Sequence, residues 1–309
     1  RARRERGLRL SPVAGEATLP VYLKLVAAML SWGGTWVAGR VVAQAVGTPI
    51  AAAAARFTLA ALVLGAVMFA KREPLDGPAL RRAWRLIVGL ALTGVFFYNL
   101  CFFYGLKYVE AGRGALVVAL NPVVVAALAW WLGGERARPL AVLGAVLAFV
   151  GCLTVIGNGD PLAPLAGRIG LGEVLLLGCV VCWTAYTFVG RRATRLVSAL
   201  AATFWSCALG AVLLWAAAFA AGGIDWAQWS LAVWAAVAFL GVFGTAIGFT
   251  WYTDAVRVLG AARAAMFINL VPVAAVLMAA LALGEAFPPS VALGGAAVLA
   301  GVWLTTTRR

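Results

Sequence analysis

The sequence predicts an all-α membrane protein with ten transmembrane helices, arranged as two inverted five-helix repeats around a central cavity. Three observations support this fold class. The 309 residues are 64% hydrophobic and only 12% charged, whereas a soluble domain carries roughly 25% charged residues. Continuous apolar stretches of about 20 residues recur along the chain, and such stretches cross a bilayer as helices. A long segment is also repeated 150 positions later.

The apolar stretches are continuous rather than alternating, which favours helices over a β-barrel. The connections between them are mostly short, so sequential helices are expected to be antiparallel neighbours. The ten expected spans are 21–41, 50–70, 86–106, 111–132, 140–157, 171–190, 199–221, 231–253, 262–283 and 288–305.

Lysine and arginine residues gather on one side of the predicted membrane. With the N-terminus in the cytoplasm, twenty of them lie on the cytoplasmic side. The five on the outer side are Arg40, Arg56, Lys107, Arg113 and Arg168. The positive-inside rule therefore places both termini in the cytoplasm, and residues 1–20 form a basic tail suited to anionic lipid headgroups.

Several classes of function are disfavoured by what the sequence lacks. It contains no histidine and no glycine-rich loop followed by Lys-Ser/Thr, so histidine-based catalysis and ATP hydrolysis by that route are excluded. The five cysteines fall inside expected spans, where inert buried thiols are favoured over redox or metal chemistry. The net charge of +14 is spread between the apolar runs, which disfavours nucleic acid binding. A lipid-processing enzyme would need a nucleophile with a base, or an acidic cluster, near a membrane interface, and the sequence shows neither. We expect no catalytic residue, metal or cofactor.

The internal repeat divides the chain into two halves, residues 21–157 and 171–305. Between 111–151 and 261–301, thirteen of forty-one positions are identical. The pairs that compositional bias does not explain are Arg113 with Arg263, Pro122 with Pro272, and Glu135 with Glu285. The segments SWGGTWVAGR (31–40) and CWTAYTFVGR (182–191) also agree, at an offset of 151. Because each half has an odd number of helices, the second half enters the membrane inverted, which is typical of secondary transporters.

The paired prolines predict two irregular helices. Proline within a helix leaves the carbonyl four residues earlier without its partner, here Val118 for Pro122 and Ile268 for Pro272. Such a carbonyl is tolerated only against protein or a wet cavity. We therefore expect both helices to be kinked and to frame the cavity. The alternative is a packing kink without any ligand.

Polar and aromatic side chains inside the spans form the candidate substrate site. The candidates are Trp32, Thr35, Tyr98, Asn99, Asn121, Trp183, Tyr186, Trp251 and Asn269. They offer hydrogen bonds to a zwitterion and flat walls to an aromatic side chain. The alternative for the Trp and Tyr residues is anchoring at the membrane interfaces. No acidic residue falls at the middle of a span, which disfavours proton antiport.

Arg56 lies about two turns inside the second span, where a charge costs roughly 3 kcal/mol on insertion scales. We assign it, with Pro122 and Pro272, a gating or structural role. Snorkelling to the outer headgroups and direct binding of a carboxylate are the alternatives. Glu135 and Glu285 are expected to terminate helices or pair with arginines. The glycines kept in both halves are assigned to helix packing: Gly144, Gly151, Gly294 and Gly301.

Residues 21–305 resemble EamA-type exporters of the drug/metabolite transporter superfamily. The resemblance is carried by SWGGTWVAGR, by ARFTLAALVL (55–64), by GLKYVEAGRGALVVALNPVVVAALAWWLGGE (105–135) and by FGTAIGFTWYTDAVRVLGAARAAMFINLVPVAAVLMAALALGE (243–285). Within the superfamily the chain is most similar to YddG-type exporters of aromatic amino acids. The resemblance implies a central cavity lined by spans 1, 3, 4, 6, 8 and 9, and export across a bacterial inner membrane.

The expected function is therefore secondary transport by alternating access, without ATP and without enzyme activity. The expected substrates are small amphipathic metabolites, foremost aromatic or apolar amino acids. The alternative is efflux of drugs or of other metabolites, such as sugar or nucleotide derivatives. The expected partners are the small-molecule substrate and the lipid bilayer, and no obligate protein partner is evident.

Overall fold

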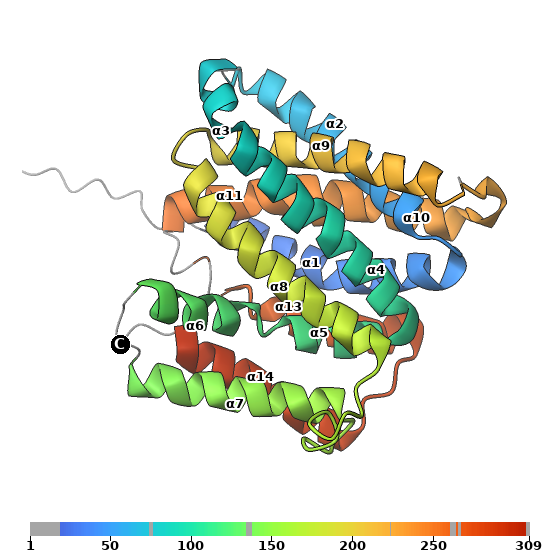
Figure 1. Ribbon diagram of the computed structural model, residues 1–309, viewed down its shortest axis with the longest axis vertical. Coiled ribbons are helices and arrows are strands. Elements are labelled where there is room, and N and C mark those ends of the chain that lie inside the picture. The colour runs from blue at the N-terminus through green and yellow to red at the C-terminus, as the bar shows by residue number, and fades with distance from the viewer. Residues whose placement is uncertain are drawn as a thin grey trace, which may run out of the picture.

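The computed structural model describes residues 19–73, 77–133, 138–222, 224–259, 264 and 267–306, and every regular element in this part of the chain is helical (Figure 1). The elements are α1 (Leu19–Ala45), α2 (Ile50–Ala70), α3 (Gly77–Leu90), η1 (Ala91–Phe97), α4 (Tyr98–Tyr108), α5 (Ala111–Val118), α6 (Asn121–Gly133), α7 (Pro139–Ile156), α8 (Leu171–Ala193), α9 (Ala199–Ala220), η2 (Trp226–Gln228), α10 (Leu231–Gly241), η3 (Val242–Ile247), α11 (Gly248–Leu259), α13 (Leu270–Leu283) and α14 (Pro289–Thr306).

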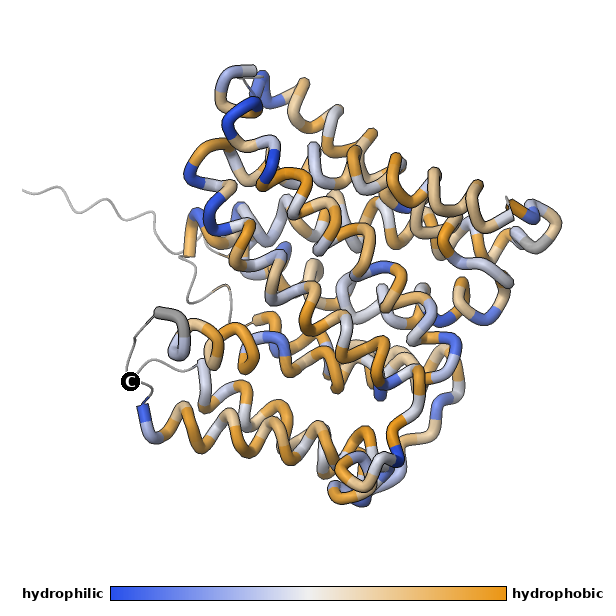
Figure 2. The backbone as a smooth tube through the Cα atoms, viewed as in Figure 1, coloured by the Kyte–Doolittle hydropathy of each residue, from blue (hydrophilic) through white to orange (hydrophobic). Residues whose placement is uncertain are grey.

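The protein is an all-helical polytopic membrane protein, as predicted. Among the described residues, nine helical segments are long and apolar enough to cross a bilayer, and α13 is a shorter apolar helix. Each of the ten expected spans coincides with one of these segments, although the start of the ninth lies outside the described residues. Residues 1–18 of the basic tail, Glu135 and Arg263 lie outside them too. Apolar residues cover most of the helices, and hydrophilic residues concentrate toward their ends (Figure 2).

Both proline-containing spans are interrupted, but the Ile268 carbonyl is not left unpaired as expected. The fourth span is two helices, because α5 ends at Val118 and α6 begins at Asn121. At the ninth span, α13 begins at Leu270, and the Val271 N–H donates to the Ile268 carbonyl at 3.0 Å. The expectation of an unpaired Ile268 carbonyl is therefore wrong, because a tighter turn supplies a donor three residues later.

The glycines of α7 and α14 show how the two halves are related. These helices lie side by side at one edge of the bundle (Figure 1). A Cβ atom at Gly144 would lie 2.7 Å from the Gly301 carbonyl oxygen, and one at Gly151 would lie 2.6 Å from the Gly294 carbonyl oxygen. Because Gly144 corresponds to Gly294 and Gly151 to Gly301, this antiparallel contact is reciprocal, as across a two-fold axis. The halves are thus inverted, and the packing role expected for these glycines is confirmed.

Two π-helical segments occupy corresponding places in the two halves. The first residues of η1 and η3, Ala91 and Val242, are 151 positions apart. Such segments are rare and occur often at functional sites. Each is packed closely through a glycine: Gly94 lies against the ring of Tyr186 on α8, and Gly244 lies against the methyl group of Thr35 on α1. Each π segment is therefore packed against the first helix of the opposite half.

Candidate substrate site

Arg56 forms the central polar contact between three helices. Its Nη1 donates to Oδ1 of Asn99 at 3.1 Å, and its Nη2 and Nε donate to Oγ1 of Thr245 at 3.3 and 3.4 Å. Asn99 and Thr245 are almost fully buried, with 1% and 2% exposure, while Arg56 is partly exposed. The guanidinium therefore joins α2 to α4 of its own half and to η3 of the other half.

The π segments orient the two side chains that accept these bonds. Asn99 Nδ2 donates to the carbonyl of Val95 in η1 at 2.7 Å, and the Thr245 hydroxyl donates to the carbonyl of Leu240 at 3.0 Å. These bonds fix the orientation of both side chains, so that their oxygen atoms accept from Arg56. Sequence reasoning named Asn99 but omitted Thr245 from the site, because nothing in the sequence marks a π segment.

An aromatic row lies beside this polar contact, formed by Tyr98, Trp183 and Tyr186. The ring centroids of Tyr98 and Trp183 are 5.9 Å apart, and those of Trp183 and Tyr186 are 5.4 Å apart. Tyr98 precedes Asn99 in the chain, so the row begins next to the Arg56 contact. All three rings are partly exposed. Four of the nine predicted substrate residues, Tyr98, Asn99, Trp183 and Tyr186, are thus brought together.

Trp32 belongs to a second aromatic contact, between α1 and α11. Its ring centroid lies 5.4 Å from that of Phe249 and 5.5 Å from that of Tyr252. Trp32 corresponds to Trp183, and Phe249 corresponds to Tyr98, so the two aromatic contacts repeat each other. Phe249 was not predicted, because only polar residues, tyrosines and tryptophans were selected from the spans.

The other predicted residues are dispersed. Thr35 donates to the Trp32 carbonyl at 2.6 Å, within its own helix. Asn121 begins α6, and its Oδ1 is buried without a hydrogen-bond partner among the described residues. Asn269 precedes α13 without a side-chain capping bond. Trp251 packs against the small apolar cluster of Leu25, Ala28 and Met29 instead of the aromatic row.

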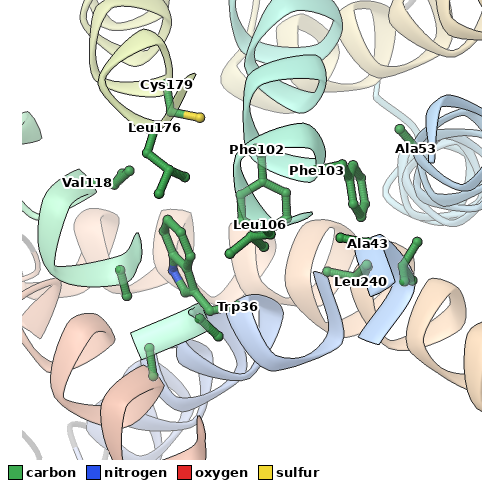
Figure 3. Close-up of a cluster of buried hydrophobic side chains, with 14 of the residues drawn as sticks. Trp36, Ala43, Ala53, Phe102, Phe103, Leu106, Val118, Leu176, Cys179 and Leu240 are labelled. Atoms are coloured by element: carbon green, nitrogen blue, oxygen red, sulfur yellow. The ribbon is translucent and has the colours of Figure 1, made fainter. Parts of the chain in front are cut away.

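We call the end of the bundle where α1 and α4 finish the distal end. A buried apolar cluster, the plug, lies toward this end (Figure 3). It adjoins the aromatic row, because the ring centroids of Phe102 and Tyr98 are 6.2 Å apart. The Trp36 and Phe102 rings pack edge to face with centroids 5.1 Å apart, and Leu106 and Leu176 lie beside them. Each of these side chains is at most 5% exposed. Water and solutes are therefore excluded from this level of the bundle.

A set of hydrogen bonds, the distal latch, lies around this plug. Three of its members bond to backbone carbonyls: Arg40 donates to those of Leu106 and Val109, Gln44 Nε2 to that of Lys107 at 3.0 Å, and Lys107 to that of Gly47. Arg113 Nη2 pairs with Glu173 Oε1 at 3.4 Å. The Ala111 and Gly112 amides donate to the Glu285 carboxylate at 2.8 and 3.0 Å. Glu285 thereby caps the first turn of α5 from across the interface between the halves.

The opposite, proximal end is not closed in the same way. A Cβ atom at Gly39 would lie 2.5 Å from the Phe102 ring, whereas the nearest atom to a Cβ at the corresponding Gly190 would be Leu90 Cδ2, 3.7 Å away. Arg191, which corresponds to Arg40, is exposed and makes no hydrogen bond to the part of the chain that the structure describes. Equivalent positions thus have different environments at the two ends.

The model of one protein family matches this chain twice. The family is described as the EamA-like transporter family, and the matches cover residues 19–157 and 170–307. The chain belongs to the EamA-like transporter family. The two matches coincide with the two inverted halves, so each half is one unit of this family of transporters.

Relatives of this EamA-like transporter include several proteins of similar length. The chain is 31% identical over 256 residues to the uncharacterized transporter YyaM of Bacillus subtilis, covering 82% of this chain and 83% of that protein. It is 29% identical over 125 residues to the aromatic amino acid exporter YddG of Ancylobacter novellus, covering 40% and 43% of the two chains. A solved crystal structure shares the fold, with a TM-score of 0.63 at 24% identity over 92% of this chain and 96% of the other.

Weakening the latch of this EamA-like transporter is expected to open its distal end. In Glu285→Gln the neutral amide keeps one acceptor oxygen where the carboxylate supplied two charge-assisted bonds. If this weakens the closed distal end by about 1.4 kcal/mol relative to an open one, the ratio of open to closed molecules rises tenfold. In a background without native cysteines, a cysteine at buried Val109 should then react about tenfold faster with a thiol reagent.

The matched control for the latch is Asp160→Asn, which removes an exposed ion pair with Arg168 at the same end. Exposed pairs contribute little, so the reactivity of a cysteine at position 109 should stay at its starting value. Equal reactivity in Glu285→Gln and Asp160→Asn would show that Glu285 does not hold the distal end closed.

Proposed function

We propose that this transporter exports small amphipathic metabolites, foremost aromatic or apolar amino acids, across a bacterial inner membrane without ATP. The observation that carries the proposal is the partly exposed aromatic row next to the Arg56, Asn99 and Thr245 contact. Flat apolar rings fit an aromatic or apolar side chain, and the adjacent polar groups fit a charged backbone. The partial similarity to an aromatic amino acid exporter supports the same substrate class.

Alternating access is supported by the combination of inverted symmetry and unequal ends. Two halves with the same fold in opposite orientation can exchange their conformations, which would close the proximal end and open the distal one. The interrupted spans that contain Pro122 and Pro272 give each half a place where the helix direction can change. On the orientation inferred from Lys and Arg, the closed distal end faces away from the cytoplasm.

The substrate class is tested by counterflow in proteoliposomes that contain the full chain. Vesicles loaded with unlabelled tryptophan, phenylalanine or leucine should take up the labelled amino acid faster than empty vesicles. Vesicles loaded with a lipophilic cation, a sugar or a nucleoside serve as the comparison. Counterflow with one of these compounds and none with amino acids would support the alternative, efflux of drugs or of other metabolites.

The proposed orientation makes the proximal loops cytoplasmic. A cysteine replacing exposed Arg81 in α3 should react with an impermeant maleimide only in inverted membrane vesicles. A cysteine replacing exposed Thr48, between α1 and α2, is the matched control and should react only in intact spheroplasts. The reverse pattern would place both termini outside the cytoplasm.

Transport should depend little on an imposed proton gradient. The acidic residues near the spans are already paired or lie next to a helix start: Glu110 precedes α5, Glu173 pairs with Arg113, and Asp254, within α11, pairs with Arg257 at 3.6 Å. Proton-coupled transporters generally use a carboxylate inside the membrane. Tryptophan flux with and without a gradient of one pH unit should agree within about twofold. Concentrative uptake driven by the gradient would contradict this and direct attention to Glu110 and Asp254.

A further inference from the structure

Arg56 is a cation inside the membrane, and its hydrogen-bond partners among the described residues are all neutral. Its three hydrogen bonds go to the amide oxygen of Asn99 and the hydroxyl of Thr245. The described ion pairs are Arg113 with Glu173, Arg168 with Asp160, and Arg257 with Asp254. None of these carboxylates neutralises Arg56. An uncompensated charge within a membrane protein is costly and marks a functional site by default.

The guanidinium also has donors left over. It carries five N–H groups, and three hydrogen bonds are formed with the described residues. Both acceptors are fixed by a further bond of their own, Asn99 to the carbonyl of Val95 in η1 and Thr245, itself in η3, to the carbonyl of Leu240 in α10. Arg56 is thus held in a defined position, and two of its five N–H groups have no acceptor among the described residues. A purely structural arginine would be expected to have its donors satisfied or its charge paired.

The surroundings of Arg56 indicate which kind of ligand its guanidinium could bind. Phe57 lies beneath its guanidinium, with the ring centroid 4.9 Å from Cζ. Tyr98, at the start of the aromatic row, directly precedes Asn99, whose Oδ1 accepts a hydrogen bond from Nη1 of Arg56. A ligand with a negative group and a flat ring could therefore contact Arg56 and the row at the same time. A planar carboxylate matches the forked geometry of a guanidinium.

We propose that Arg56 binds the carboxylate of the transported molecule, while Tyr98, Trp183 and Tyr186 contact its side chain. This inference rests on the proposed function for the identity of the substrate, and it adds that the carboxylate is required for recognition. The positive charge of Arg56 then has its counter-ion only when substrate is bound. Carrying a monocarboxylate through the membrane beside a fixed cation avoids moving an unpaired negative charge past apolar walls.

The test compares four probes that share an indole ring, by calorimetry on the full chain in detergent. L-Tryptophan and indole-3-propionate carry a carboxylate, whereas tryptophanamide and tryptamine do not. The wild type should bind the first two at least ~30-fold more tightly, because removing one partner of a buried charge pair has an effect of this size. Arg56→Gln should remove most of that preference, and Arg56→Lys should retain part of it because the charge remains.

The matched control is Arg257→Gln, an exposed arginine of α11 paired with Asp254. Its preference for the carboxylate probes should equal that of the wild type. A folded Arg56→Gln variant that still prefers carboxylates would overturn the inference. If Arg56→Gln does not fold, the decision passes to the wild type and Arg56→Lys: equal binding of tryptophan and tryptophanamide, or an unchanged preference in Arg56→Lys, would overturn it as well.

The outcomes separate this inference from the proposed function. Indole-3-propionate binding that depends on Arg56, without any counterflow of amino acids, would keep the carboxylate site and refute amino acid export. Tryptophan counterflow at the same rate in wild type and Arg56→Gln would keep export and refute the role of Arg56.

Discussion

Replacing Pro122 and Pro272 together with alanine is expected to reduce transport at least tenfold while the protein still inserts and folds. Pro122 and Pro272 lie in the first turns of α6 and α13, where proline is tolerated but prevents the helix from continuing into the preceding turn. Alanine removes that block, so each substitution would favour a continuous helix through the present interruption. The interruptions between α5 and α6 and before α13 would then be lost, and with them the flexible points between the two conformations.

The measurements for the prolines are tryptophan counterflow and thermal unfolding in detergent, for both single variants and the double variant. Thermal stability should stay close to that of the wild type, because both prolines lie in first helical turns. Pro139→Ala is the matched control: Pro139 also lies in a first helical turn, but α7 is one uninterrupted helix. Full transport in the double variant would mean that the prolines serve packing alone.

Gly144→Ala is expected to destabilise the protein by about 1–3 kcal/mol, as overpacking in a tight core does. The added Cβ would lie 2.7 Å from the Gly301 carbonyl oxygen and 2.8 Å from the Thr305 amide nitrogen. These are backbone atoms of α14, so they cannot rotate away as a side chain would. The two helices must separate, and the reciprocal contact between the halves is lost along their whole length.

Gly190→Ala is the control, and its effect should have the opposite sign. It also lies within a helix, α8, but the nearest atom to its added Cβ would be 3.7 Å away. Alanine in place of glycine stabilises an unobstructed helix by up to about 1 kcal/mol. Thermal unfolding in detergent should therefore rank Gly190→Ala above the wild type and Gly144→Ala below it. Equal melting temperatures would refute the steric role of Gly144.

The sequence alone determined the placement of the membrane spans, because a segment that crosses a bilayer must be apolar and largely helical to satisfy its backbone. It also revealed the repeat, and the repeat predicted both the inversion and the glycine packing between α7 and α14. These features depend on residues that are near one another in the chain or at a fixed offset. The candidate site was predicted in part: Tyr98, Asn99, Trp183 and Tyr186 do lie together.

Only the tertiary structure decided how Arg56 is held and which end of the bundle is closed. Arg56 and Thr245 are 189 positions apart, and the geometry that turns the Thr245 hydroxyl toward Arg56 comes from a π segment whose residues resemble any other apolar helix. Gly39 and Gly190 are likewise each followed by an arginine, but their packing differs. Two inverted halves with similar local sequences have two arrangements of nearly equal energy, and long-range packing selects between them.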